Sequence, residues 1–332
     1  MVGTDEADGA DVNLIIPALS TLKALNDSEL STYWNRFTGA GLNLADQKFV
    51  VSLKIDGMAA HLEYKDGKLI KAATRGNGVV GKSFLPKTKF MSCIPKTIQD
   101  KGHILIRGEI HLTDASFTKL NQILIECGEE EQVNARNSTA GLLNSDQIKQ
   151  AEKKLDLLSF KAYGFYNLDK SDSKFGFYPT YAEDLKAAEA LGFITPRWEI
   201  LPREQICRET CDAWISKADF DADGIVCRVN SNDVCAQLGS NNKALYGVIA
   251  LKPKPELVEV MIKDIEWSLG SRELTPVGII EAIDLDGATI SRVGLHSVKN
   301  MLDLDAIPGK TIKIVRSGGV IPRAYHRDTV EV

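Results

Sequence analysis

The segment VVSLKIDGMAA places charged side chains inside a run that is otherwise typical of a buried strand. Because side chains alternate along a strand, Ser52, Lys54 and Asp56 should share one face, while Val51 and Leu53 share the other. A lysine on a largely buried strand is usually paired or functional, and its amine can act as a nucleophile. A solvated lysine on an edge strand gives the same pattern, so K-x-D-G alone leaves both interpretations open.

A second motif, GNGVVGKS over Gly76–Ser83, fits the P-loop form G-x-x-x-x-G-K-[ST], and its first six residues fit the dinucleotide form G-x-G-x-x-G. Both forms require a helix directly afterwards, whose N-terminus binds the phosphate. Pro86 follows closely and disfavours that helix. We therefore favour a Gly-rich turn after a strand, with a P-loop NTPase as the alternative.

The elements that must position these residues are predicted from hydrophobic spacing and turn signals. Leu30, Trp34 and Phe37 have helical spacing and predict a helix from Asn26 to Phe37, and Asp66-Gly67 predicts a hairpin over residues 59–74. The other predicted strands are 49–57, 103–112, 158–166, 222–229 and 246–255, and the other predicted helices are 114–127, 144–155 and 181–193.

After the prolines of KPKPE, short strands separated by Gly and Pro predict a small β-barrel or sandwich. We therefore predict three parts. Residues 1–16 form a disordered acidic tail, residues 17–254 form an α+β domain with antiparallel sheets, and residues 255–332 form a small all-β domain.

The composition is that of an ordinary globular protein, with 332 residues, 44% hydrophobic and 26% charged. No apolar run is long enough to span a bilayer, and the acidic start does not resemble a secretory signal, so a cytoplasmic location without membrane contact is expected. The six cysteines form no paired C-x-x-C clusters, and no zinc site is expected. A net charge of −5 means that any nucleic acid must bind to a local basic patch.

The order of the motifs resembles that of the NAD-dependent DNA ligases. The successive segments are SLKIDGMAAHLEY, AATRGNGVVG, IRGEIHL, NARNSTAGLL, FKAYGF, ADGIVCRV and VIALKPKPE, and LTPVGIIEAI, SRVGLHS and IKIVRSGGVIP are similar to that family's OB-fold domain. The match extends from about Pro17 to Pro322. The resemblance implies a covalent nucleotidyltransferase (adenylation) domain followed by an OB-fold barrel.

By this resemblance, Lys54 is the nucleophile that takes AMP from NAD, passes it to a 5′-phosphate at a nick in double-stranded DNA, and so permits the 3′-hydroxyl to seal the nick. The reaction requires the neutral amine, whereas a free lysine is protonated near pH 7, so partial burial and nearby cations are expected to favour the neutral form. A ring of cations with Mg²⁺ would neutralise charge during phosphoryl transfer.

The resemblance assigns the remaining roles residue by residue. The implied catalytic residues are Lys54, Asp56, Arg75, Glu109 and Lys252. The implied nucleotide contacts are Ser20, Thr21, Ser52, Lys54, Arg75, Glu109, Tyr163, Arg228 and Lys252. The implied DNA contacts are Arg136, Arg272, Arg292, Lys313 and Arg316, and the implied Mg²⁺ ligands are Glu109 and Asp223.

The chain departs from the family pattern at several positions. Ser52 stands where the family has an acid that reads the adenine amino group, Arg228 replaces a lysine, and Asn144 stands at the place of a second arginine. Arg and Lys differ in reach and hydration, so Arg228 is not equivalent to the family residue.

The sequence also leaves no room before Pro17 for the family's nicotinamide-binding cap domain, and has no zinc, helix-hairpin-helix or BRCT module after the barrel. We therefore expect a second polypeptide to supply missing parts. The alternatives are an ATP-dependent nucleic-acid ligase, including an RNA ligase or capping-type enzyme, and a non-catalytic scaffold subunit of a ligase complex.

Overall fold

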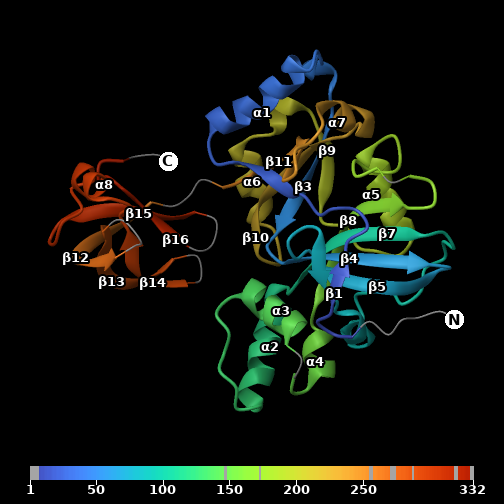
Figure 1. Cartoon of the computed structure of the whole chain (residues 1–332), viewed down its shortest axis with the longest axis horizontal. Coiled ribbons are helices and arrows are strands. Elements are labelled where there is room, and N and C mark those ends of the chain that lie inside the picture. The colour runs from blue at the N-terminus through green and yellow to red at the C-terminus, as the bar shows by residue number, and fades with distance from the viewer. Residues whose placement is uncertain are drawn as a thin grey trace. The chain divides into compact units, whose positions relative to one another are not determined.

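The computed structural model describes residues 7–145, 148–171, 173–253, 257–269, 274–285, 288–317 and 321–329. The chain divides into two compact units, Met1–Pro253 and Lys254–Val332 (Figure 1). The predicted α+β domain with antiparallel sheets, followed by a small β-barrel, is confirmed. No helix in the described part of the chain is both long and apolar enough to cross a membrane.

The larger unit contains two main sheets. Sheet I has the order β2 (Ser20–Ala24), β11 (Ala244–Leu251), β10 (Ala222–Val229), β3 (Phe49–Ile55) and β9 (Trp198–Leu201). Sheet II has the order β5 (Lys68–Thr74), β4 (Met58–Lys65), β7 (Ile104–His111) and β8 (Ser159–Asn167). Neighbouring strands are antiparallel except β2 and β11, which are parallel.

One face of sheet I is sealed by helices. Alternate residues of β3, among them Val51 and Leu53, pack into an apolar core with the aromatic side chains of α1 (Asp27–Gly39), and α6 (Arg208–Ile215) and α7 (Asn232–Leu238) contribute to the same core. Because side chains alternate along a strand, the other residues of β3 project from the opposite face. This alternation is what frees one face of sheet I for polar side chains.

Sheet II is covered on one face by α2 (Asp114–Glu126), α3 (Ala135–Asn144) and α4 (Ala151–Leu155), which gather beside it in Figure 1. The predicted single helix over 144–155 is wrong. Helix α3 ends at Asn144, Ser145 is extended, and Gln150 is in the left-handed region before α4. Asn, Ser and Asp side chains compete with the helix for backbone hydrogen bonds, which explains an end within NSDQ.

The N-terminal segment packs against sheet II. Strand β1 (Asp11–Asn13) pairs with β6 (Val80–Lys82), and Val12, Leu14 and Ile16 are buried. Arg107 on β7 donates hydrogen bonds to the carbonyls of Ile16 and Pro17. The prediction of a disordered tail over 1–16 is therefore wrong for residues 11–16, because alternating apolar residues within the acidic segment are buried there.

The Gly-rich motif is a turn, as predicted, and the P-loop alternative is wrong. Gly76 and Gly78 both have positive φ, and the chain then continues as the short strand β6. A 3-10 helix, η2 (Leu85–Phe90), follows in place of an α-helix. Short 3-10 helices are also present at η1 (Leu44–Asp46) and η3 (Arg203–Gln205).

The smaller unit is a closed barrel. Its strands are joined in the order β12 (Val258–Leu269), β13 (Leu274–Leu285), β14 (Ala288–Gly294), β16 (Ile321–Tyr325) and β15 (Thr311–Ser317). The short helix α8 (Val298–Asp303) contributes Met301 to a core that includes Ile262, Val293 and Ile312. Strands β12 and β13 are 12 residues long, which exceeds the short strands expected from the turn spacing.

Candidate active site

Two lysines share one carboxylate on the open face of sheet I. Lys54 Nζ on β3 donates to Asp223 Oδ1 at 2.8 Å, and Lys252 Nζ, just after β11, donates to Asp223 Oδ2. The side chains of Lys54, Asp223 and Lys252 are 24%, 31% and 11% exposed. A ligand can therefore reach Lys54 and Asp223, while the shared carboxylate holds the largely buried Lys252 beside them.

Gly224 permits this arrangement. It pairs with Lys54 across β3 and β10 and has a φ of +153°. A Cβ atom there would lie 2.4 Å from the carbonyl oxygen of Leu251, so no other residue fits without moving β11. The close approach brings the residue before Gly224, Asp223, next to the residue after Leu251, Lys252.

The charges of these groups depend on one another. Burial would raise the pKa of Asp223, but Lys54 and Lys252 outweigh burial and hold that pKa below its ordinary value. Burial, together with the positive charge of Lys54, lowers the pKa of Lys252, and Asp223 opposes the shift. The carboxylate is therefore ionised at neutral pH, and Lys252 gives up its proton more easily than a free lysine.

Asp56 is paired with a cation from α3. Arg136 Nη1 lies 3.1 Å from Asp56 Oδ1, and the Arg136 side chain is 49% exposed. Burial raises the pKa of Asp56, Arg136 opposes this, and Asp223 adds to it. Arg136, predicted to contact DNA, thus lies at the edge of the site and remains accessible.

Sheet II supplies Glu109 and Tyr163. Tyr163 on β8 donates to Glu109 Oε2 on β7 at 3.4 Å. Burial raises the pKa of Glu109 to about 8, although Lys54 and Arg136 oppose the shift. Gly57 allows the chain before β4 to lie close to Glu109 and Ile110 of β7. A Cβ at this position would lie 2.3 Å from the carbonyl oxygen of Ile110 and 3.0 Å from Glu109 Cγ.

Arg75 forms a separate cluster with the N-terminal segment. Its guanidinium donates to Ser20 Oγ at 2.7 Å and to the carbonyl oxygen of Ala18 at 3.2 Å. Thr21 follows Ser20 on β2 and is partly buried. Two residues with predicted nucleotide contacts, Arg75 and Ser20, are therefore in direct contact with each other.

Arg228 is separated from Lys54 along the sheet. It lies opposite Val50 on β3, whereas Gly224 lies opposite Lys54. Its guanidinium is buried over the ring of Tyr181, 3.9 Å from the ring centre, and donates to Asn232 Oδ1 at 2.7 Å and to the carbonyl oxygen of Phe175. These contacts give Arg228 a structural role, and the phosphate contact that the resemblance implies stays a prediction.

The interactions of Tyr181 continue towards the second sheet. Its hydroxyl donates to the carbonyl oxygen of Tyr163 at 2.7 Å. Helix α5 (Tyr181–Ala190) begins here, with Thr180 and Glu183 forming a capping box. Sequence reasoning missed Tyr181 and Asn232, because their partners are distant in the sequence.

The barrel cations predicted to contact DNA differ in their surroundings. Arg292 on β14 pairs with Glu266 on β12, and both side chains are about half exposed. Lys313 donates to the carbonyl oxygen of Thr329 at 2.9 Å. Arg272 lies outside the described residues, and Arg316 lies on β15, with its side chain outside the described part.

The predicted Mg²⁺ ligands do not form a site by themselves. Both carboxylate oxygens of Asp223 accept hydrogen bonds from lysines, and Glu109 accepts one from Tyr163. Within the described ranges, no group of three or more His, Cys, Asp or Glu is placed to hold a metal ion. Mg²⁺ also uses phosphate oxygens and water as ligands, so the protein need not provide a complete site.

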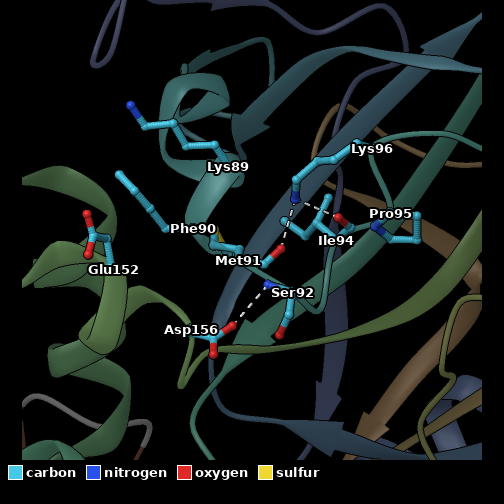
Figure 2. A pocket seen from close by; sticks show the side chains of 9 residues that line it. All are labelled: Lys89, Phe90, Met91, Ser92, Ile94, Pro95, Lys96, Glu152 and Asp156. Atoms are coloured by element: carbon cyan, nitrogen blue, oxygen red, sulfur yellow. Dashed lines mark hydrogen bonds between the residues drawn. The ribbon is translucent and has the colours of Figure 1, made fainter.

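A groove of about 490 Å³ lies elsewhere, beside η2 and α4 (Figure 2). Lys96 there donates to the carbonyl oxygens of Met91 and Ile94, at 2.8 and 2.7 Å, and the amide of Ser92 donates to Asp156. These polar groups satisfy one another, and none of the predicted site residues lines the groove.

Two models of known protein families match the chain. Residues 7–256 match the model of the NAD-dependent DNA ligase adenylation domain, and residues 259–329 match the NAD-dependent DNA ligase OB-fold domain. The chain belongs to the NAD-dependent DNA ligase family. Its larger unit is therefore the adenylation domain and its barrel the OB-fold domain, as the motifs predicted.

Individual relatives agree with this assignment. DNA ligases from Halothermothrix orenii and Oceanobacillus iheyensis are each 32% identical to the chain, over 97% and 95% of it, and these alignments cover 48% and 47% of the relatives. The chain thus spans about half the length of the curated relatives it matches. Among solved structures, Pmar-Lig_PreS3 has a TM-score of 0.51 at 13% identity, covering 93% of this chain and 67% of that one. A Lig E DNA ligase has a TM-score of 0.50 at 15% identity, covering 93% and 98%. These two likenesses concern the fold alone.

Proposed function

We propose that the chain is the catalytic core of a DNA ligase that seals nicks through a covalent Lys54–AMP intermediate, with NAD as the AMP donor. The observation that carries this proposal is the pair Lys54 and Lys252, held on one carboxylate, with Lys54 and Asp223 accessible from the open face of sheet I. Membership of the NAD-dependent family supports the choice of donor.

In the first step, the Lys54 amine attacks the α-phosphorus of the donor and displaces a phosphate-bearing leaving group. Asp223 fixes the position of the amine before attack, and Lys252 offsets the negative charge on the phosphate oxygens. AMP then passes to a 5′-phosphate at the nick, and the 3′-hydroxyl displaces it. Arg136, half exposed beside Asp56, is positioned to contact the DNA phosphate.

A non-catalytic scaffold is the second candidate that the sequence leaves open. The shared carboxylate argues against it, because Asp223 balances only one of the two lysine charges, and the second charge is costly at partial burial unless a ligand uses it. Mg²⁺ dependence and a second polypeptide stay predictions. EDTA treatment tests the first, and co-purification with other proteins of the source cell tests the second.

The proposal is tested by incubating the purified chain with Mg²⁺ and either NAD or ATP, then measuring intact mass. We expect an added AMP in the wild type and in Lys48→Ala, an exposed control before β3, and none in Lys54→Ala. Sealing of pre-adenylated nicked DNA is measured in parallel. No AMP adduct from either donor, together with no sealing, would contradict the catalytic proposal.

A further inference from the structure

Lys23 is a cation on the open face of sheet I that neither the motifs nor the family roles single out. The strand β2 that carries it has Leu22 and Ala24 in contact with the core of sheet I. By alternation, Lys23 projects from the opposite face, which also carries Lys54. The side chain of Lys23 is exposed, so it is available to a ligand.

Backbone pairing fixes where Lys23 lies. The residues of one row across sheet I are paired in the order Trp198, Ser52, Val226, Ala250 and Lys23. Lys54 and Lys252 each lie two residues further along their segments, on the same face as this row. The amide of Lys252 donates to the carbonyl oxygen of Ala24 at 3.2 Å, which ties the end of β11 to β2 next to Lys23.

The charges on this face do not balance. Lys54 and Lys252 share the single carboxylate of Asp223, whereas the side chain of Lys23 forms no ion pair or hydrogen bond within the described residues. Lys23 pairs with Ala250 on β11, two residues before Lys252, so the two lysines lie on neighbouring segments of the same face.

The neighbouring acids do not compensate for this excess. Asp56 is paired with Arg136, and the carboxylate of Glu109 accepts a hydrogen bond from Tyr163 on sheet II. Three lysines on this face therefore lie with one carboxylate, that of Asp223, which Lys54 and Lys252 already share. An excess of this kind attracts an anion, and phosphate is the anion that the chemistry of Lys54 requires.

Resting on the proposed function, we infer that Lys23 binds the phosphate that leaves the AMP donor when Lys54 attacks. In that step the Lys54 nitrogen forms a bond to the α-phosphorus and the P–O bond of the phosphoanhydride breaks. The electron pair stays on the departing phosphate oxygen, and the proton from Nζ passes to water. The leaving phosphate gains a negative charge, which a free ammonium group stabilises.

The phosphate subsite at Lys23 suits the leaving group of either AMP donor, NAD or ATP. The leaving group is the phosphate of nicotinamide mononucleotide when NAD is the donor, and pyrophosphate when ATP is the donor. Both present a phosphate next to the α-phosphorus. In the reverse reaction the same phosphate attacks Lys54–AMP, so Lys23 acts in both directions.

The experiment compares Lys23→Gln, which removes the charge, with Lys23→Arg, which keeps it. The matched control is Lys48→Gln, an exposed lysine before the opposite end of β3. Lys54–AMP formation is followed by mass under single-turnover conditions with NAD and with ATP. The reverse rate is measured by adding nicotinamide mononucleotide or pyrophosphate to the adenylated chain.

We expect Lys23→Gln to slow both directions roughly tenfold, Lys23→Arg to recover most of the rate, and Lys48→Gln to match the wild type. A loss confined to one donor assigns the subsite to that donor's leaving group. Equal rates for Lys23→Gln and Lys48→Gln overturn the inference, as does a lowered melting temperature that Lys23→Arg does not restore. A wild-type chain that forms no adduct from either donor instead contradicts the proposed function itself.

Discussion

Two ends of the same strand pair, β3 with β10, carry cations in very different surroundings. At one end Lys54 and Asp223 are accessible to ligands, and Lys252 is paired with the same carboxylate. At the other end Arg228 is buried between Tyr181 and Asn232. Both cations project from the same face of sheet I, so alternation along the strand does not distinguish them.

The difference arises from what covers each end. Tyr181 begins α5 and Asn232 begins α7, and both pack onto the Arg228 end. No described helix contributes a partner to Asp223, whose hydrogen-bond partners are Lys54 and Lys252. One end can therefore exchange its internal ion pairs for a phosphate, whereas the other holds the sheet and two helices together.

The largest effect is expected at the open end, from Asp223→Asn. The substitution removes the charge that two lysines share, and an amide offers only one acceptor oxygen. We expect Lys54–AMP formation to slow roughly 100-fold, with little change in unfolding, because the group is accessible. Single-turnover mass measurements check this, with Asp212→Asn as an exposed control on α6. An unchanged rate would show that Asp223 does not position Lys54.

Arg228→Ala should have the opposite profile. It leaves the acceptors Asn232 Oδ1 and the Phe175 carbonyl without their buried donor. We expect the free energy of unfolding to fall by about 2–4 kcal/mol, measured in urea. The folded fraction should form Lys54–AMP within a few-fold of the wild-type rate. The free energy of unfolding of Arg228→Lys should lie between those of Arg228→Ala and the wild type. A loss of Lys54–AMP formation without a loss of stability would assign Arg228 to the reaction.

Tyr181→Phe tests the connection from the buried end to sheet II. It removes one hydroxyl, which donates to the carbonyl oxygen of Tyr163. We expect a loss of about 1 kcal/mol in the free energy of unfolding. The rate of adduct formation should change less than threefold by the same reasoning, since the backbone of β8 remains paired with β7. A larger loss of rate would show that the Tyr163 position controls the reaction.

The last prediction is a dependence of stability on pH from Glu109. Its pKa is raised from 4.5 to about 8 in the folded chain. Between these values the folded chain binds more protons at Glu109 than the unfolded chain, so stability falls as pH rises through this window. Glu109→Gln should remove that part of the slope. Melting temperatures of both proteins from pH 5 to pH 9 check it, and parallel curves would contradict the shift.

Local signals in the sequence predicted local structure well. Asp66 and Gly67 form the expected hairpin turn, both with positive φ, because the turn type depends on those two residues. Alternation around Lys54 gave the correct faces of β3. The strand structure of residues 11–16 was mispredicted because it depends on pairing with the distant strand β6. The helix end at Asn144 was mispredicted although local side chains can account for it.

The residues of the candidate site were predicted from the family resemblance more than from periodicity in the sequence. The meeting of Lys54, Asp223 and Lys252 joins residues far apart in sequence, and no periodicity encodes it. Lys23 could have been found from STLKA, where apolar residues flank it on both sides, but the strand is short and its parallel partner lies more than 200 residues away. For Arg228, the position in the motif did not reveal that the side chain is buried.

We propose that AMP is carried by Lys54 and by no other lysine of the open face. Peptide mapping by tandem mass spectrometry of the chain after reaction with NAD or ATP tests this directly. We expect AMP on the peptide that contains Lys54, with Lys23 and Lys252 unmodified. AMP on Lys23 or Lys252 in the wild type, or an undiminished adduct in Lys54→Ala, would contradict it.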